Sequence, residues 1–157
     1  GEHIVSLLGG KGKVVELEGI AGTSAARDRG QGFNDAIAGT EIEVVAKQVA
    51  DFDRTKGLSV MENILQAQPE IDAVFAHNDE MALGAQKAIE ASGREIIIVG
   101  FDATDDAVAA VKEGKMSATV AQQPSLIGEL GVETAKKILD GESVEDFVPV
   151  DLQLVTE

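Results

Sequence analysis

The stretch "DAVFAHNDEMALGAQKAIEASGREIIIVGF" (residues 72–101) decides the fold. It begins with an apolar run at 72–78 and continues, at 79–93, with apolar residues at helical spacing that stop at Gly93. A second apolar run, "EIIIVGF", follows at 95–101. Short apolar runs bounded by turn residues are typical of buried strands, and a three-to-four spacing is typical of helices. The stretch therefore predicts a strand, a helix and a second strand.

The same alternation continues in both directions along the chain. We expect further strands at 13–19, 42–50 and 117–123, and further helices at 24–39, 53–68, 105–114 and 124–141. Ser24 is a candidate N-cap, Pro124 suits a first helical position, and Gly141 follows the last helix. Strands that alternate with helices predict an α/β fold, in which an open parallel sheet is flanked by helices on both faces.

Composition excludes several classes of function. The 157 residues include 13 basic and 28 acidic side chains, so the formal net charge is −15. This charge argues against binding to nucleic acid or to an anionic membrane surface, both of which require a basic face. The chain has no cysteine, and its two histidines, His3 and His77, are too far apart in sequence to indicate a zinc site. No apolar run approaches the ~18 residues of a membrane span.

The sequence contains no recognisable catalytic or cofactor motif. "GGKGK" (9–13) and "GIAGTS" (19–24) are rich in glycine, but neither fits a nucleotide-binding pattern. A nucleophile elbow is absent, and neither histidine has the neighbours of a catalytic triad. A phospho-receiver domain would need an acidic pair after the first strand, where this chain has "EGIAG". We therefore expect a protein that is not an enzyme and has no cofactor or metal.

Polar side chains follow each expected strand. Open parallel sheets bind ligands at the carboxyl ends of their strands, so these side chains should share one rim. They are Arg29, Asp51, Asp53, Asn78, Asp79, Asp102, Gln122 and Gln123. Phe52 lies between two aspartates and is the one phenylalanine of five outside a run that could be buried. Carboxylates, amides, a guanidinium and an aromatic face are groups that bind a small polyhydroxylated ring.

Each rim residue also has a structural interpretation. Asp53 and Asp79 each open an expected helix, so capping is the more frequent role for such a residue. Asn78 could form a turn, and Arg29 could pair with an aspartate on its own helix. Phe52 could fold back onto the core. Phe101 is expected to be packed and His77 to be a partly covered strand residue, and residue chemistry alone leaves these alternatives open.

Five stretches together resemble one family. They are "GIAGTSAAR" (19–27), "ADFDRTKGLSVMENIL" (50–65), "NDEMALGA" (78–85), "IIIVGFDAT" (96–104) and "ATVAQQP" (118–124). These stretches resemble the ribose-binding proteins of bacterial ABC importers, which belong to the type I periplasmic sugar-binding family. The resemblance covers essentially the whole chain but only the C-terminal half of the family's protein. Proteins of that family have two flavodoxin-like lobes joined by a three-segment hinge, with the sugar between them.

The resemblance implies a division of the chain. Residues 1–122 would form the C-terminal sugar-binding lobe, and residues 1–10 would be a truncated helix, since "GEHIVSLLGG" starts without a cap signal. Residues 123–157 would be a hinge-crossing helix and a final strand that belong to the other lobe. Without that lobe, we expect the apolar stripe of the helix at 124–141 either to fold back on the sheet or to drive association, for example as a homodimer.

The resemblance also implies a sugar site. The family's contact positions in this lobe fall on Arg29, Phe52, Asn78, Asp102 and Gln122, which favours D-ribose or a similar pentose over a hexose. The implied partners are the other lobe and the importer's membrane subunits, in the periplasm or another extracytoplasmic space. The alternative is the effector-binding core of a sugar-responsive, LacI-type transcriptional repressor, which shares this fold but would need a DNA-binding headpiece.

Overall fold

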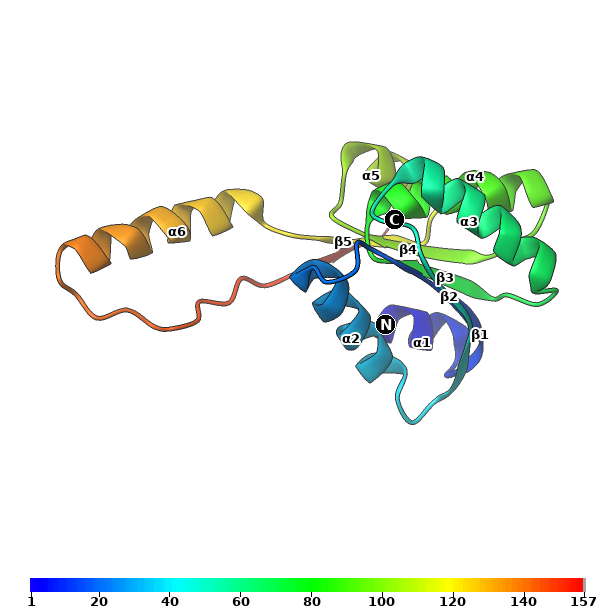
Figure 1. Ribbon diagram of the computed structural model, residues 1–157, viewed down its shortest axis with the longest axis horizontal. Coiled ribbons are helices and arrows are strands. Elements are labelled where there is room, and N and C mark those ends of the chain that lie inside the picture. The colour runs from blue at the N-terminus through cyan, green and yellow to red at the C-terminus, as the bar shows by residue number, and fades with distance from the viewer. Residues whose placement is uncertain (157) are drawn as a thin grey trace.

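One six-stranded sheet organises the protein, in the order β2-β1-β3-β4-β5-β6. The computed structural model describes residues 1–156 (Figure 1). The strands are β1 (Lys11–Glu18), β2 (Glu41–Val49), β3 (Ala73–Ala76), β4 (Ile97–Phe101), β5 (Ala118–Ala121) and β6 (Gln153–Val155). The first five strands run parallel, and β6 pairs antiparallel to β5. The predicted α/β fold with its parallel sheet is confirmed. The final strand, which the resemblance assigned to the other lobe, pairs here with β5 as the antiparallel edge of this sheet.

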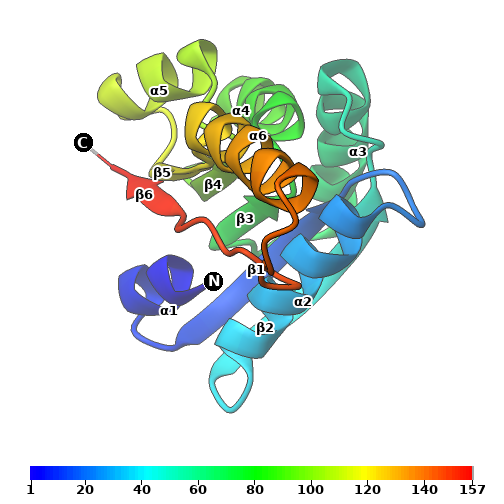
Figure 2. The same ribbon diagram turned by 90° about the vertical axis from the view of Figure 1, so that its left-hand side faces the viewer.

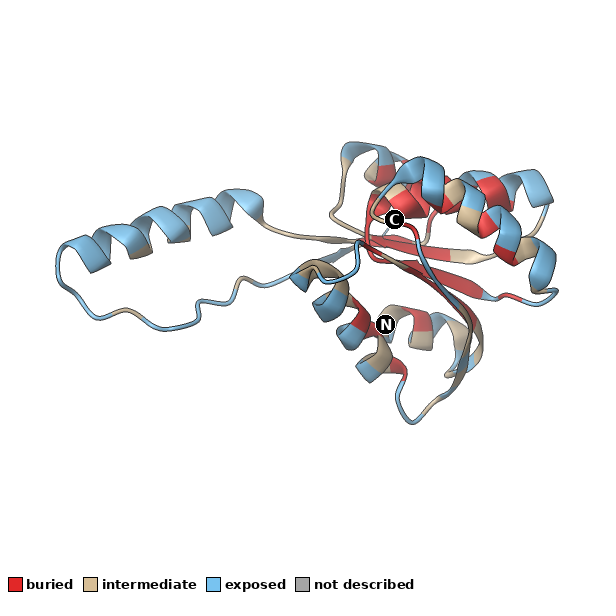
Figure 3. Cartoon of the chain, viewed as in Figure 1, coloured by how far each residue is buried: buried red, intermediate tan, exposed pale blue. Residues whose placement is uncertain are grey.

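Five helices cover the two faces of this sheet. Three of them lie on one face, namely α3 (Arg54–Ala67), α4 (Asp79–Ser92) and α5 (Asp105–Lys112) (Figure 1). The opposite face carries α1 (Glu2–Leu8) and α2 (Ser24–Ile37). Neighbouring residues of a strand point to opposite faces, so β1 contributes Val14 to one core and Val15 to the other. The buried residues gather in these two layers, as Figure 3 shows.

The helices that reach the carboxyl rim of the sheet begin at side-chain caps. Thr23, Asp53, Asn78 and Thr104 each accept a hydrogen bond from a backbone N–H in the first turn of the helix that follows. The capping role of Asp53 is therefore confirmed. Two other cap assignments are wrong. Thr23 rather than Ser24 caps α2, and Asn78 rather than Asp79 caps α4, which frees the Asp79 carboxylate for other partners.

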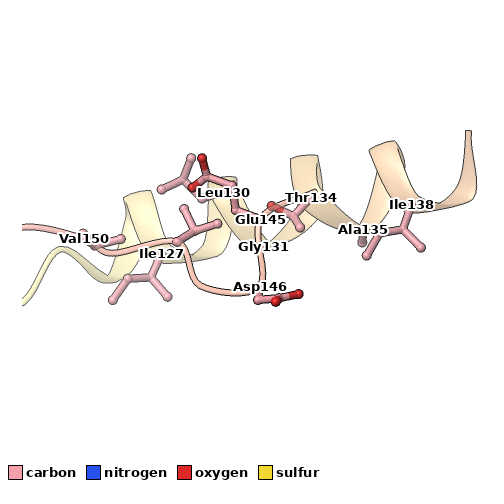
Figure 4. Close-up of a pocket in the computed structure, with 10 residues that line it drawn as sticks. Ile127, Leu130, Gly131, Thr134, Ala135, Ile138, Glu145, Asp146 and Val150 are labelled. Carbon is pink, nitrogen blue, oxygen red and sulfur yellow. The ribbon is translucent and has the colours of Figure 1, made fainter. Parts of the chain in front are cut away.

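The last helix, α6 (Pro124–Leu139), stands apart from the sheet in Figure 1 and projects toward the viewer in Figure 2. None of its residues is buried, and the chain returns from it through an extended segment to β6. A groove lies between the apolar side of α6 and this returning segment (Figure 4). Of the two outcomes expected for this helix, folding back on the sheet is not observed. The most exposed phenylalanine is Phe147, on the returning segment at 77% exposure, and not Phe52 as the sequence suggested.

No helix in the described range is both long enough and apolar enough to cross a lipid bilayer.

We expect hydrogen exchange to separate α6 from the rest of the molecule. In a dilute, monomeric sample the amides of α6 should exchange rapidly, because an isolated helix of 16 residues is marginally stable in water. The amides of α4, in which nine residues are buried, should be the slowest. Exchange measured by mass spectrometry after protease digestion resolves the two helices. Protection of α6 equal to that of α4 would contradict this description.

Candidate functional site

The candidate site lies at the carboxyl ends of the parallel strands. The strand order reverses between β1 and β3, and in open α/β sheets this switch point is where ligands bind. The segments after β1 and β3 therefore meet here, joined by those after β2, β4 and β5. Each of the five sequence-predicted residues lies on one of these segments. The structure brings all five to the same end of the sheet.

Three of the predicted residues form one hydrogen-bonded cluster. Arg29 on α2 donates from Nη2 to Oδ1 of Asp102 at 3.0 Å. Gln122, just after β5, donates from Nε2 to the same oxygen at 2.8 Å. Arg29 also donates from Nη1 to the carbonyl oxygen of His77 at 2.6 Å. The pair of Arg29 and Asp102 is partly shielded from water, with side-chain exposures of 14% and 29%, so its position is well defined.

Aromatic rings flank the Arg29 guanidinium. Its central carbon, Cζ, lies 4.0 Å from the centre of the Phe101 ring and 5.8 Å from the centre of the Phe52 ring. Phe52 is half-buried, packs against the core under α3 and covers Gly19 so closely that a Cβ there would overlap its ring. The structure thus shows the packing contact that the sequence left open as an alternative for Phe52. It also places that ring beside the cluster.

Asn78 joins the site through the Phe52 backbone. Its Nδ2 donates to the carbonyl oxygen of Phe52 at 3.3 Å, and its Oδ1 caps α4 by accepting from Met81 N. Capping uses the oxygen and leaves one N–H of the amide for another partner. Asn78 therefore has the capping role typical of its position and still faces the rim.

Backbone strain is concentrated at this rim. Within residues 1–156, four non-glycine residues have φ in the left-handed region: Asp51 (53°), Phe52 (60°), Asp102 (118°) and Ala103 (52°). Each such residue costs about 1–2 kcal/mol relative to an ordinary conformation. The four form two consecutive pairs, and each pair contains one predicted sugar contact. Strain of this kind persists where the surrounding structure holds the backbone, which is a feature of functional sites.

A buried charged cluster lies under the rim. The Gly19 N–H donates to Nδ1 of His77 at 3.3 Å, so Nε2 carries the proton and donates to Oε1 of Glu16 at 2.9 Å. Both side chains are fully buried. Burial alone would raise the pKa of Glu16, but the hydrogen bonds from His77 and Asn34 and the charge of Lys47 outweigh it and lower the pKa below its ordinary value. Glu16 is therefore a buried carboxylate with its charge balanced.

The arrangement provides groups for hydroxyl recognition. Asp102 Oδ2 and Gln122 Oε1 accept no hydrogen bond from any atom in residues 1–156, so both remain as acceptors. Arg29 and Asn78 provide donors next to them. No group of three or more acidic, histidine or cysteine side chains in the described chain could hold a metal ion. Carboxylate, amide and guanidinium groups in this arrangement can hydrogen-bond to a ligand that carries several hydroxyls.

Three of the other rim residues do not join the cluster. Asp51 pairs with Lys56, and Asp53 caps α3. Gln123 donates to the carbonyl oxygen of Asp151 and so links the two chain segments between the sheet and α6. Their partners lie on the surface or on the returning segment. All rim residues share the same position after a strand, so sequence position alone could not separate these three from the five predicted contacts.

Three residues shape the site in ways that the sequence analysis did not predict for them. Phe101 stacks on Arg29, His77 is fully buried and provides a carbonyl acceptor, and Asp79 is fully buried beneath the loop of Asp102. Burial raises the pKa of Asp79, although hydrogen bonds from Thr119 and Thr104 act in the opposite direction. A signal for Phe101 was its place directly before Asp102. No signal in the sequence indicated the long-range partners of Asp79.

Comparison with known proteins gives a consistent set of relatives. The model of a family described as periplasmic binding protein domain matches residues 1–143. The ribose import binding protein of Haemophilus influenzae is 59% identical over all of this chain and 54% of its own length. That of Bacillus subtilis is 56% identical over 98% of this chain and 50% of its own length.

A solved structure supports the same relationship. An ABC transporter periplasmic solute binding protein from Actinobacillus succinogenes, with bound D-allose, superposes with a TM-score of 0.93 at 34% identity. The superposition covers 99% of this chain and 55% of that one. The chain thus spans about half the length of the curated relatives that it matches.

We expect Glu16→Gln to lower the free energy of unfolding by roughly 2 kcal/mol at neutral pH, because charge-assisted hydrogen bonds are stronger than neutral ones. Because the folded-state pKa of Glu16 is lowered, its ionised side chain contributes fully to the stability of the folded state above the ordinary pKa of 4.5. This stabilisation is lost as pH falls through the folded-state pKa. The variant should therefore lose less stability than wild type between neutral pH and pH values well below 4.5. Urea unfolding across this range measures the difference. Parallel pH profiles for the two proteins would contradict the assignment.

Proposed function

The chain belongs to the periplasmic binding protein family, and on that premise we propose that it is one lobe of the solute-binding component of an ABC sugar importer. The proposed ligand is D-ribose or a similar pentose. The proposed contacts are Arg29, Phe52, Asn78, Asp102 and Gln122. The proposed setting is extracytoplasmic, where such a component delivers its sugar to the importer's membrane subunits.

One observation carries the proposal, namely the cluster in which Arg29 and Gln122 both donate to a single oxygen of Asp102. This geometry fixes the carboxylate and leaves its other oxygen as an acceptor. A sugar with adjacent hydroxyls uses such an acceptor together with the neighbouring guanidinium and amide groups. Phe52 adds an apolar ring beside them.

The proposed site is one wall of a two-walled cleft. The side chains of Arg29 and Asp102 keep part of their surface in water, so a ligand bound here alone would remain largely solvated. We propose that a second lobe, corresponding to the half of the relatives that this chain does not span, encloses the sugar from the opposite side. The apolar side of α6, with Ile127, Leu130 and Ile138 facing the groove, would pack on that lobe (Figure 4).

We also propose that the protein performs no chemical reaction. Its curated relatives are named as binding proteins. The buried histidine is committed to Gly19 and Glu16, so it is not available as a general base. The carboxylate of Asp102 is likewise held by two donors. The Asp102 carboxylate is thus arranged to hold a ligand in place, and neither His77 nor Asp102 is arranged to transfer a proton to it.

We expect this chain to bind D-ribose with a dissociation constant no lower than ~1 mM, which corresponds to about −4 kcal/mol. Water competes for every hydrogen bond at an open wall, so each contributes less than the ~1.5–3 kcal/mol of a desolvated charge-assisted bond. Adding the second lobe of a relative in trans should tighten binding by orders of magnitude. Isothermal calorimetry and NMR titration cover this range. Micromolar binding by the monomeric chain would contradict the half-site description.

We expect Asp102→Ala to weaken ribose binding most among single substitutions at the rim. The change removes the acceptor oxygen and leaves the Arg29 and Gln122 donors without their shared partner. Asp35→Ala is the matched control, since Asp35 is an exposed carboxylate at the other end of α2 and pairs with Gln31. The control should bind ribose like the wild type. Equal affinities of Asp102→Ala and wild type would remove Asp102 from the site.

A further inference from the structure

We propose that Asp79 and Thr119 form a clamp that holds the loop of Asp102 in its strained, binding-competent conformation. Asp79 would thus be a positioning residue of the sugar site that acts through Asp102 and does not touch the ligand. The inference rests on the proposed function for its link to sugar. The clamp itself is argued from contacts within this chain.

Three consecutive backbone N–H groups of the loop have fixed acceptors. Asp102 N donates to the carbonyl oxygen of Val120 at 2.8 Å, as a continuation of the sheet. The next two acceptors are side chains. Ala103 N donates to Oγ1 of Thr119 at 3.1 Å, and Thr104 N donates to Oδ2 of Asp79 at 2.8 Å. Two of the three loop amides therefore depend on Asp79 and Thr119.

The two side chains are joined to each other and shielded from water. Thr119 donates from Oγ1 to Oδ1 of Asp79 at 2.7 Å, so the hydroxyl accepts from the loop and donates to the carboxylate at once. Asp79 and Thr119 are both fully buried. The Thr104 hydroxyl also approaches Oδ2 of Asp79, at 3.2 Å. The Asp79 carboxylate therefore accepts three hydrogen bonds. Two come from Thr104 in the loop, and the third comes from Thr119, which in turn binds the loop.

The loop needs such a clamp because of its backbone. Asp102 and Ala103 are consecutive non-glycine residues with φ of 118° and 52°, a conformation that L-residues rarely adopt. It is this conformation that directs the Asp102 carboxylate to Arg29 and Gln122. If the clamp is released, the backbone can relax and the carboxylate moves away from both donors.

Gly100 on β4, which has no side chain, leaves space for the Asp79 carboxylate. A Cβ at this position would overlap Oδ1 of Asp79, the oxygen that accepts from Thr119. Any larger residue at 100 would displace the carboxylate. The space for Asp79 is therefore built into the strand that leads directly to Asp102.

The test removes the Thr119 hydroxyl. We expect Thr119→Val to shift the side-chain amide signals of Gln122 and to speed up exchange of the Ala103 amide in NMR spectra of the full chain. Ribose binding in an NMR titration should weaken about tenfold, equivalent to ~1.4 kcal/mol. Thr119→Ser, which keeps the hydroxyl, should restore both the spectra and the affinity. Should Thr119→Val fail to fold, Asp79→Asn, which keeps the shape of Asp79 but removes one acceptor, takes its place.

Thr40→Val is the matched control. The Thr40 hydroxyl also makes two hydrogen bonds, since it donates to Ile37 O and accepts from Ile42 N. It lies in the turn before β2, at the opposite end of the sheet. Its replacement should lower stability and leave the Gln122 signals and ribose binding unchanged. Unchanged Gln122 and Ala103 signals in Thr119→Val would overturn the clamp, whatever the affinity. Altered signals in a chain that does not respond to ribose would instead overturn the proposed function and leave the clamp in place.

Discussion

The ion pair between Arg29 and Asp102 is the interaction on which the rest of the site depends. It connects α2, which follows β1, to the loop after β4, and so ties together segments from both sides of the strand-order reversal. Arg29 also binds the carbonyl of His77 at the end of β3. One guanidinium thereby fixes three carboxyl-end segments relative to one another. The hydrogen-bonding groups of the rim are thus held in place by contacts within the protein, which would reduce the entropy lost on binding a ligand there.

The fold supports this pair through two buried carboxylates. Glu16 lies under the Gly19 side of the rim, and Asp79 lies under the Asp102 side. A buried charge is costly unless its hydrogen bonds are satisfied, and in residues 1–156 no buried side-chain polar atom lacks a partner. Both carboxylates bind groups that belong to rim loops. Most of the buried polar side chains in residues 1–156 thus help to hold the loops at this rim, and Gln86, which binds Glu90, is the exception.

The sequence predicted the architecture well because the fold depends on local patterns. Apolar runs and helical spacing located the strands and helices, and their alternation predicted a parallel sheet. It also predicted that polar residues after the strands would meet. The caps were misplaced by one residue at Ser24 and Asp79. The preceding residues, Thr23 and Asn78, also have a side-chain oxygen that can accept from the first turn, and the sequence does not show which residue takes the cap conformation. The exposure of Phe147 and the partners of Asp79 and His77 depend on long-range contacts, which no local pattern encodes.

The most direct test of the central claim is a map of NMR signals on addition of D-ribose to the isotope-labelled chain. If the cluster of Arg29, Asp102 and Gln122 binds the sugar, the largest changes will be in the side-chain signals of Arg29, Gln122 and Asn78. The side-chain amides of Gln31 and Gln86, which bind Asp35 and Glu90 away from the rim, serve as internal references and should not move. Changes confined to other surfaces, or none at ribose concentrations of about 100 mM, well above the expected dissociation constant, would contradict it.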